Sequence, residues 1–504
     1  MKPQRLGLFL AVALVLASPL WARENWIYAR TDNFELFSTA SEKKSRNLLV
    51  ELEQFRASFL TAFSLGRAHE PRATVVLFGN DRQFTPYKPL YQGKTRDVFG
   101  LFVDGRDEVA IALTTETDDP DINNPTEAIY HEYVHLLLHT RGIQFPLWLD
   151  EGLAELYSTF QVEGDKAVFG RAKSIYTTVL NFSALMPLQK LFTVTKKSAA
   201  YNDEERAGEF YAQSWALTHY LICGADPTNK GKLIRFLALQ ETSPESMEAN
   251  FRQAFGKTPA ALEMELRSYL EGGQFYIRKA KLPLADLAAK ISFRPATDFE
   301  RDFALLNLRW RVHQNGDATQ SALHFAEQQP RSPRPCELLA AIAMTEDETI
   351  KALQYWRRAA ELKSDNAFVY LQLARDGARA VTQDFRLDYR LPAKLAADLR
   401  LWLDRALELS PDYPEAQEIL ALVEAFAPEV RAPVVLRLQE GVNQMRDSSR
   451  TLLALAIIRW RLKDQPTSAK IVESLLASPQ VAPEVKAAAR TLRERLATTD
   501  AVRP

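Results

Sequence analysis

Cysteine is nearly absent from this sequence, and charge of one sign is in no excess. The 504 residues include two cysteines, Cys223 and Cys336, which either form a disulfide in an oxidising compartment or stay as buried thiols, so no inference rests on them. Lysine and arginine together number 63, against 64 for aspartate and glutamate. Such a balance provides no overall field to attract a polyanion. We therefore expect neither nucleic acid nor an anionic membrane surface as a partner.

Long apolar runs are also absent, except at the N-terminus. Lys2 and Arg5 precede an unbroken apolar stretch from Leu6 to Ala17, and residues 18–22 are small or turn-prone. This order is typical of a secretory signal peptide, here residues 1–22. The apolar stretch is shorter than the roughly 20 residues that span a bilayer, and no cysteine follows it to carry a lipid anchor. The pattern predicts an exported protein, periplasmic or secreted, with no stable membrane span after cleavage.

The remaining sequence has the composition of an ordinary globular protein, with 46% hydrophobic and 25% charged residues. Its length exceeds the roughly 250 to 300 residues that one hydrophobic core holds, so we expect several domains. Strand signals nearly vanish beyond about residue 276. The chain is therefore divided into an α+β domain at residues 23–275, a linker at 276–300 and an all-α domain at 301–504.

The first of these domains shows strand and helix patterns in alternation. Short β-branched or aromatic runs between turn residues predict an opening hairpin, a long amphipathic helix, an internal strand and a second hairpin at the edge of the same sheet. These segments are residues 26–30 with 34–38, 42–63, 74–78, and 98–103 with 108–113. The region is therefore expected to fold as α+β.

A helix with clear start and stop signals follows. Asn124 is a suitable N-cap residue, Pro125 suits the first helical position, and Glu127 stands where a capping box has its acidic residue. Apolar periodicity continues to Thr140, and Gly142 is well placed to end the helix in a left-handed cap. The sequence HEYVH lies in the middle of this helix.

HEYVH places two imidazoles four residues apart. His131 and His135 therefore project from one helix face, where both can bind one metal ion, and Glu132 lies close enough to reach a water molecule at that ion. A surface helix with solvated side chains is the alternative. Ile129, Val134 and neighbouring leucines argue against it, because they make the helix largely buried, and buried histidines need partners.

A catalytic zinc ion needs a third protein ligand and leaves its fourth position for water. The stretch PLWLDEGLAEL provides candidates, because Glu151 and Glu155 lie four residues apart and share a face of a second predicted helix. We assign Glu151 as the third metal ligand. We assign Glu155 as the partner of the imidazole of His131, or of its neighbour, on the side of the ring away from the metal. Asp150 is an alternative to Glu155 in this role. The simpler interpretation of the whole stretch is that Glu151 and Glu155 are solvated on an exposed helix.

HEYVH followed by WLDEGLAEL resembles the gluzincin clan of zinc metallopeptidases, especially its bacterial peptidase MA-like branch, in which helical repeats often follow. The resemblance covers roughly residues 25–275 and implies a zincin-like domain, with a mixed sheet and active-site helices. It also implies that His131, His135 and Glu151 bind Zn²⁺ and that Glu132 is the general base. Only 15 residues separate His135 from Glu151, and no GAMEN-like sequence precedes the motif. Aminopeptidase specificity is therefore not supported.

A third histidine, His139, extends the same helix face by one more turn, giving HEYVHLLLH. Three ligands on one straight helix would span about 12 Å along its axis. One tetrahedral zinc ion cannot reach all three. We interpret His139 as a packing residue or an outer partner of the site.

The oxyanion that develops during hydrolysis needs a hydrogen-bond donor besides the metal. Tyr211 is the candidate, because YAQSWALTHYL resembles the YxKGAxxLxxL helix of gluzincin aminopeptidases, whose tyrosine has that role. Gln213 and Ser214 stand where that pattern has Lys and Gly, so a tyrosine packed at the start of a core helix is the alternative. Tyr201 and His219 are reserve donors.

The second half of the chain is a series of amphipathic helical segments with short turns. Residues 359–374 and 406–421 align with Ala, Glu, Leu and Asp in step and resemble the junction between tetratricopeptide (TPR) repeats, where small residues let helices approach closely. Their offset of 47 residues exceeds the repeat length of about 34, and an insertion near residues 381–392 accounts for the excess. Further helix pairs are expected at residues 301–328 and 451–477. TPR-like repeats predict a protein partner.

These patterns together predict an exported zinc metallopeptidase that hydrolyses peptide bonds in a peptide or protein substrate. The hairpin at residues 98–113 would lie beside the metal and pair with an extended substrate as an added strand. One alternative is an inactive or structural metallopeptidase-like domain that serves, with the repeats, as a protein-interaction scaffold in the cell envelope. The presence of Glu132 argues against it, because a structural zinc has no use for a base. Zinc-dependent hydrolysis of another amide is a third alternative.

Overall fold

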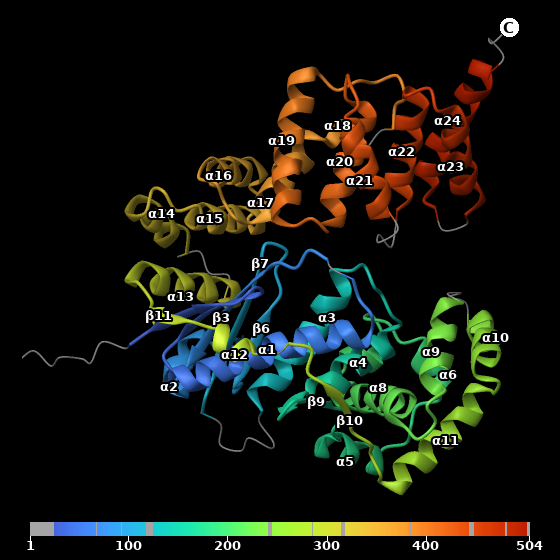
Figure 1. Ribbon diagram of the computed structural model, residues 1–504. Coiled ribbons are helices and arrows are strands. Elements are labelled where there is room, and N and C mark those ends of the chain that lie inside the picture. Colours follow the sequence, from blue (N-terminus) through green and yellow to red (C-terminus); the bar gives the residue numbers. More distant parts are fainter. Residues whose placement is uncertain are drawn as a thin grey trace, which may run out of the picture.

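The computed structural model describes residues 25–500, apart from residues 67, 92, 117–123, 240–243, 285, 314–317, 383–384, 443–447 and 479–480 (Figure 1). The expected signal peptide, residues 1–22, lies outside the described residues. In the described part, a mixed sheet with helices comes first along the chain, and a row of helices follows it. The α+β fold class expected from the sequence is thereby confirmed.

A six-stranded sheet forms the centre of the first part. Its strands are β1 (Ile27–Arg30), β2 (Phe34–Ser38), β3 (Arg72–Phe78), β6 (Gly100–Val103), β7 (Glu108–Thr114) and β11 (Phe293–Pro295). They lie in the order β11-β1-β2-β3-β7-β6. The pairs β2–β3 and β3–β7 are parallel, whereas β1–β2, β6–β7 and β1–β11 are antiparallel. Both predicted hairpins, β1–β2 and β6–β7, are confirmed, and β6 is an edge strand.

Helices lie on both faces of this sheet and beside it. Those in contact with it or near its ends are α1 (Glu42–Ala62), α2 (Asp81–Phe84) with a 3₁₀ turn (Thr85–Tyr87), α3 (Pro125–His139), α12 (Leu287–Lys290) and α13 (Asp298–His313). Those beside it are α4 (Leu147–Ser158), α5 (Ser174–Phe182), α6 (Leu188–Phe192), α7 (Ala199–Asn202), α8 (Glu204–Cys223), α9 (Asn229–Ala238), α10 (Pro244–Phe255) and α11 (Pro259–Gly272). Two small sheets complete this part: β4 (Leu90–Tyr91) with β5 (Lys94–Thr95), and β8 (Gln161–Glu163), β9 (Lys166–Phe169) and β10 (Arg278–Lys281).

Alternating side chains of the sheet divide the core into two layers, because successive residues of a strand point to opposite faces. Leu36 and Ile111 belong to the layer that also contains the buried residues of α1, α3 and α4. Phe37 and Ala112, their neighbours along the strands, belong to the opposite layer, which α13 covers. The sheet therefore holds α3 in place from one side and α13 from the other.

Helices α4 and α8 cross closely at Gly152. A Cβ atom on Gly152 would stand 2.1 Å from Thr218 Oγ1 and 2.5 Å from the Ser214 carbonyl oxygen. Only a residue without a Cβ atom fits at such a crossing. Gly152 thus determines how near α4, which carries Glu151, comes to α8.

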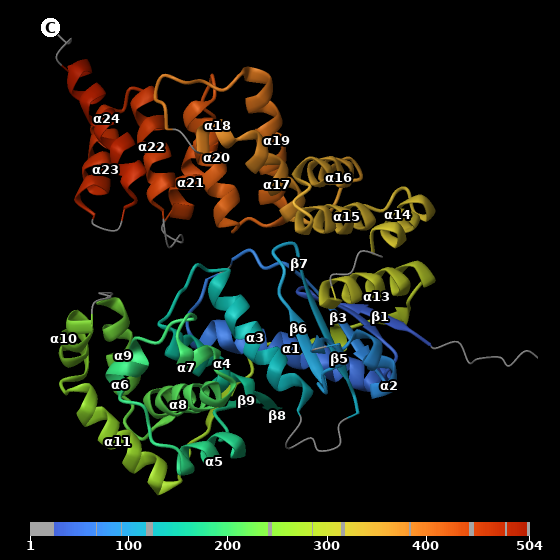
Figure 2. The same ribbon diagram turned by 180° about the vertical axis from the view of Figure 1, so that it is seen from behind.

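The second part is all α-helical in its described residues, as the sequence predicts, and its helices pack side by side in a row (Figure 2). Small residues such as Ala352, Ala359, Ala374, Ala406 and Ala421 are fully buried where the helices meet. The likeness to TPR repeats stays a prediction. The helices are α14 (Ala318–Gln328), α15 (Arg334–Thr345), α16 (Thr349–Glu361), α17 (Ala367–Gly377), α18 (Arg379–Thr382), α19 (Ala393–Leu409), α20 (Pro414–Phe426), α21 (Ala432–Val442), α22 (Ser449–Arg461), α23 (Gln465–Ala477) and α24 (Pro483–Asp500).

Residues 276–300, expected as a linker, take part in both larger sheets. β10 pairs with β9, and β11 pairs with β1 at the edge of the six-stranded sheet. Their sequences, RKAK and FRP, lack the alternation that predicts a strand, but pairing with a neighbouring strand overrides this local preference. α13 then packs Leu308 against the sheet and Trp310 against α14 and α15. The chain thus passes between the two parts through packed elements.

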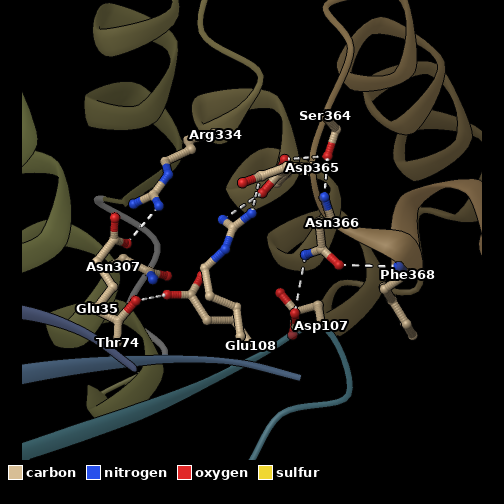
Figure 3. A network of polar contacts seen from close by, with 12 residues as sticks. Glu35, Thr74, Asp107, Glu108, Asn307, Arg334, Ser364, Asp365, Asn366 and Phe368 are labelled. Atoms are coloured by element: carbon tan, nitrogen blue, oxygen red, sulfur yellow. Dashed lines mark hydrogen bonds and ion pairs between the residues drawn. The ribbon is translucent and has the colours of Figure 1, made fainter. Parts of the chain in front are cut away.

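Polar contacts also join the two parts where β3 and β7 meet α15 and α17. Arg72 of β3 contacts Glu337 and Asp365. Asn366 Nδ2 donates a hydrogen bond to the Asp107 carbonyl oxygen at 3.0 Å, as Figure 3 shows. These contacts bring together residues more than 250 positions apart in the sequence.

The cysteines do not form a disulfide. Cys223 on α8 and Cys336 on α15 are both buried free thiols in different parts of the molecule. Among the described residues, no helix joins the length and the apolar character that crossing a membrane requires.

Candidate metal centre

The HEYVH helix, α3, begins and ends as the sequence predicts. Asn124 Oδ1 accepts a hydrogen bond from the Thr126 N–H at 3.0 Å, and Pro125 takes the first helical position. Gly142 has φ 66°, the left-handed conformation of a C-terminal cap. Buried leucines of α3 hold it against the core, and its histidines meet residues of α4.

Helix α4 carries three carboxylates into the core. All its residues from Trp148 to Ser158 are buried, including Asp150, Glu151 and Glu155. A buried carboxylate is costly unless a cation or a hydrogen-bond donor lies beside it. Each of the three therefore needs a partner, and the imidazoles of α3 lie within reach of all of them.

His131, His135 and Glu151 converge on one point. Nε2 of His131 lies 3.2 Å from Nε2 of His135 and 3.3 Å from Oε2 of Glu151, and Nε2 of His135 lies 3.4 Å from the same oxygen. Zinc binds such atoms at about 2.0 to 2.2 Å in tetrahedral geometry, which sets its ligands about 3.3 to 3.6 Å apart. The three atoms are thus spaced as ligands of one tetrahedral ion.

The hydrogen bonding of Glu151 also fits a cation. Its Oε2 is buried and has no hydrogen-bond partner within ordinary geometry. The two imidazole nitrogens nearest to it, at 3.3 and 3.4 Å, are farther than in a charge-assisted hydrogen bond. An anionic oxygen in such a place is costly unless a cation binds there. Two imidazoles and one carboxylate are the donor set of a catalytic zinc site with an open fourth position.

Each of these imidazoles has a carboxylate on its far side. His131 Nδ1 lies 3.1 Å from Glu155 Oε1, and His135 Nδ1 lies 3.3 Å from Asp150 Oδ2. A ligand histidine normally donates its second N–H to such a partner, which fixes the ring and its tautomer. Glu155 therefore lies where we expected it, and Asp150 lies near Nδ1 of the other imidazole.

The same carboxylates control the protonation of the imidazoles in the metal-free protein. Burial by itself would lower the pKa of His131, but Glu151 and Glu155 outweigh burial and raise that pKa to about 9. Burial also opposes the charge on His135, whose pKa Asp150 and Glu151 raise to about 10. Burial would raise the pKa of Glu151, but the two imidazoles lower it to about 2. A metal ion must displace the imidazole protons, so its binding strengthens as the pH rises.

A cleft of about 490 Å³ opens beside this point. Residues 97–100, which lead into edge strand β6, line one side of it, and Lys173, Tyr176 and Tyr211 are among the residues that line the rest. Glu132 is exposed on α3 and also lines the cleft. Of the three proposed ligands, His131 lines the cleft. The cleft thus brings together an edge strand, an exposed carboxylate and one proposed ligand.

Two tyrosines lie side by side next to the converging ligands. The ring centre of Tyr211 is 6.4 Å from that of His131 and 5.9 Å from that of Tyr201. Tyr201 donates its hydroxyl hydrogen to Glu151 Oε1 at 3.1 Å, so Tyr201 is occupied as a partner of the third ligand. Burial raises the pKa of the Tyr211 phenol, and hydrogen bonding to Tyr201 raises it further. Tyr211 is therefore a neutral hydrogen-bond donor at neutral pH.

His219, a reserve donor in the sequence analysis, lies away from this site. Its Nε2–H donates to the Gly170 carbonyl oxygen at 2.8 Å, and the Tyr269 hydroxyl donates to its Nδ1 at 2.9 Å. Both ring nitrogens are thus used by the core. Burial lowers the pKa of His219 to about 4, so the ring is neutral. His219 is therefore not available as an oxyanion donor.

Lys173 is a residue of the site that the sequence did not indicate. Its Nζ lies 2.6 Å from Glu155 Oε2 and 3.2 Å from Glu127 Oε2. Glu127 was expected to complete a capping box at the start of α3, but its carboxylate pairs with Lys173 instead. No spacing rule connects Lys173, in the turn before α5, with residues of α3 and α4, so only the tertiary structure finds it.

His139 lies outside the converging ligands. Its Nε2 is 3.4 Å from Asp150 Oδ2, and its side chain is 45% exposed. Its ring stacks on that of His135 at 5.7 Å. His139 thus stands behind Asp150 as an outer partner, one of the two roles that the sequence allowed.

Comparisons with known proteins bear on this same region. A family model described as "Protein of unknown function (DUF1570)" matches residues 126–244, which include α4, α8, all of α3 after Pro125, and every residue proposed for the site. A Bacillus subtilis (strain 168) protein described as "Uncharacterized protein YhcO" is 23% identical over 255 residues, covering 45% of this chain and 71% of the relative. Neither description names an activity. This chain is therefore similar to the DUF1570 family across its HEYVH and DEGLAEL helices, and its function has to be argued from the site.

Proposed function

We propose that this protein is a zinc-dependent, zincin-like metallopeptidase that hydrolyses peptide bonds. The convergence of His131, His135 and Glu151 on one point beside an open cleft carries the proposal. When bound there, zinc supplies Lewis acidity that polarises the substrate carbonyl and lowers the pKa of water. His131 and His135 would hold it through Nε2, and Glu151 through Oε2.

Side chains of the chain itself perform the proton transfers in this proposal. Glu132, exposed in the cleft one residue after His131, takes a proton from the attacking water and returns it to the leaving amine. Tyr211 donates a hydrogen bond to the oxyanion of the tetrahedral intermediate. Among the described strands, edge strand β6 pairs on one side only, and an extended peptide pairs with its other side beside the cleft.

The exported location and the role of the repeats belong to the same proposal. The N-terminal sequence supports a periplasmic or secreted protein. The row of helices α14–α24 supports a TPR-like region that binds a protein partner. A purely structural zinc site would have four protein ligands. At the proposed site, three ligand atoms converge, one each from His131, His135 and Glu151, and three ligands favour catalysis over the scaffold alternative.

Replacement of one carboxylate tests the proposal. Glu132→Gln keeps the size of the side chain and removes the base, so turnover of casein or a peptide library should fall by about 10²- to 10⁴-fold. Zinc content should not change, because Glu132 is not a ligand. Glu484→Gln, an equal loss of charge at an exposed position of α24, is the matched control and should cleave like the parent.

Two results would contradict the proposal in different ways. Equal cleavage by the parent and Glu132→Gln would remove Glu132 from the mechanism. Zinc in the parent without cleavage of any peptide would favour the scaffold alternative.

A further inference from the structure

Lys173 stands directly behind a carboxylate that supports the proposed metal site. Glu155 uses its two oxygens in different directions: Oε1 lies 3.1 Å from Nδ1 of His131, and Oε2 lies 2.6 Å from Nζ of Lys173. The Lys173 side chain is 16% exposed and that of Glu155 is 8% exposed. A chain of three side chains thus leads from the ligand imidazole to a buried amine.

The position of Lys173 connects three segments. It immediately precedes α5, while its amine contacts Glu155 on α4 and Glu127 in the first turn of α3. The ring of Tyr176, on α5, faces the same amine at 5.4 Å. Two carboxylates and an aromatic ring surround the amine, so it is engaged by the protein and not directed at a substrate carboxylate.

The charges around Glu155 indicate that the Lys173 amine compensates the negative charge of this carboxylate. Among the described residues that line the cleft, Lys173 is the one lysine or arginine, whereas Asp97, Glu127, Glu132 and Glu155 are acidic. Without the amine, Glu155 would keep its charge in the core with the His131 imidazole and the Tyr176 hydroxyl as its remaining side-chain partners. It would then turn toward solvent or toward another donor, and the His131 ring would lose its fixed orientation.

We propose that Lys173 is a positioning residue of the metal centre, which acts through Glu155 to keep Nε2 of His131 directed at the metal. The inference rests on the proposed zinc site and concerns how tightly that site retains its ion. Lys173 touches neither substrate nor metal in this role.

The other imidazole offers a comparison within the same molecule. His135 is backed by Asp150, and Asp150 by His139, at distances of 3.3 and 3.4 Å. These contacts are longer than those of Lys173, and His139 is almost half exposed, where water can replace it. Loss of His139 should therefore affect the site less than loss of Lys173.

The rate at which zinc leaves the full-length mature protein tests the proposal without reference to catalysis. We would measure zinc release to an excess of a chromogenic chelator at one pH for the parent, Lys173→Met, Lys173→Arg, His139→Gln and Glu155→Gln, together with the double variant Lys173→Met/Glu155→Gln. Lys173→Met should release zinc about 10- to 100-fold faster than the parent. Lys173→Arg should recover most of the retention, because it restores the cation.

The double variant distinguishes positioning from a general loss of stability. If Lys173 acts through Glu155, adding Lys173→Met to Glu155→Gln should change the release rate by no more than about twofold. The visible spectrum of the cobalt-substituted protein should shift in Lys173→Met, because the His131 ring moves. If Lys173→Met does not fold, Lys173→Gln, which can still donate a hydrogen bond to Glu155, takes its place and should lie between Lys173→Met and Lys173→Arg.

The outcomes separate this inference from the function on which it rests. Unchanged zinc release and an unchanged cobalt spectrum in Lys173→Met would overturn it, and so would an equal acceleration in the Glu155→Gln background. A higher KM for substrates with a free C-terminal carboxylate, with zinc release unaltered, would instead make Lys173 a substrate-binding residue. Faster zinc loss from Lys173→Met in a parent that cleaves no peptide would support the inference while the peptidase function failed. A parent that binds no zinc would contradict both.

Discussion

Two groups of mostly buried charged side chains in this molecule differ in how their charges are satisfied. The metal-site cluster lies between α3 and α4, and the interdomain cluster lies where the six-stranded sheet meets α13, α15 and α17. The metal-site cluster consists of His131, His135, Asp150, Glu151 and Glu155. The interdomain cluster consists of Glu35, Arg72, Asp107, Glu108, Arg311, Arg334, Glu337 and Asp365.

In the interdomain cluster, the carboxylates meet arginines or hydroxyl groups. Arg311 Nη2 lies 2.6 Å from Asp107 Oδ2, and Ser364 donates a hydrogen bond to Glu337 Oε1 at 2.6 Å. In the metal-site cluster, Glu151 Oε2 has imidazole nitrogens near it but accepts no regular hydrogen bond. Opposite charges that satisfy one another hold two parts of a protein together. Ligand atoms that converge without regular hydrogen bonds to one another indicate a place for an ion.

Arg72 gives the largest expected effect on stability. Arg72→Met leaves Glu337 without its cation in the core, and breaking a buried pair in this way costs about 3 to 5 kcal/mol. We expect that decrease in the free energy of unfolding by urea, with zinc content unchanged. The double variant Arg72→Met/Glu337→Gln should recover part of the loss, because it removes the unpaired charge. A loss of zinc in Arg72→Met would show that the two clusters are not independent.

Gly152 connects the metal-site cluster to the packing of α4 on α8. In Gly152→Ala the new Cβ atom would meet a side-chain oxygen of Thr218 and the backbone of Ser214, both closer than 3.0 Å. Overpacking of this kind costs about 1 to 3 kcal/mol, and the backbone contact places it near the upper end. Because α4 must move, zinc affinity should fall together with stability, as a zinc titration monitored by calorimetry would measure. Gly164→Ala, at a turn glycine with open space around it but φ 62°, should lower stability without affecting zinc.

His219 should make the free energy of unfolding depend on pH in the opposite sense to the metal-site imidazoles. The reason is that no carboxylate is among its hydrogen-bond partners. Burial lowers its folded-state pKa to about 4, whereas the unfolded chain takes up a proton near pH 6.5. The unfolded state thus binds more protons between these values, and stability is lost as the pH falls through that window. Between pH 8 and pH 5, protonation of His219 in the unfolded chain should lower the free energy of unfolding of the parent by about 2 kcal/mol. His219→Gln should not show this part of the decrease. Urea unfolding of both proteins at the two pH values measures the difference, and equal pH slopes would contradict it.

An exposed ion pair of the same interface should matter least. Arg106 Nη2 lies 3.3 Å from Glu415 Oε2, but the arginine side chain is 70% exposed. Solvent screens such a pair, so Arg106→Gln should change the free energy of unfolding by less than about 1 kcal/mol. A loss as large as that of Arg72→Met in the same urea measurement would show that burial does not determine the strength of the interdomain contacts.

Local signals in the sequence were sufficient for the ligand helices. Asn124, Pro125 and Gly142 mark the ends of α3, and the spacing of four between His131 and His135 places both on one face. The same spacing relates Glu151 to Glu155, whose side chains are directed as the sequence suggests. These predictions depend on helix geometry alone, which one segment of sequence contains.

Tertiary contacts were beyond the reach of the sequence. Lys173 lies in a turn with no periodic relation to Glu155, and its amine reaches that carboxylate because β9 returns the chain to α4. Tyr201 contacts Glu151 from the short helix α7, although it was only a reserve candidate. β10 (RKAK) and β11 (FRP) consist mostly of charged residues and a proline, so their pairing follows from the neighbouring strands. The arginine contacts between the two parts join residues far apart in the chain, and no local sequence pattern predicts these contacts.

The zinc content of the purified mature protein tests the central claim most directly. After dialysis against metal-free buffer, elemental analysis should find about one zinc ion per chain in the parent and in Arg72→Met, and close to none in Glu151→Gln, because a catalytic zinc site depends on its three protein ligands. A parent without zinc, or a Glu151→Gln variant that retains zinc as well as the parent does, would contradict the assignment of His131, His135 and Glu151 as a metal centre.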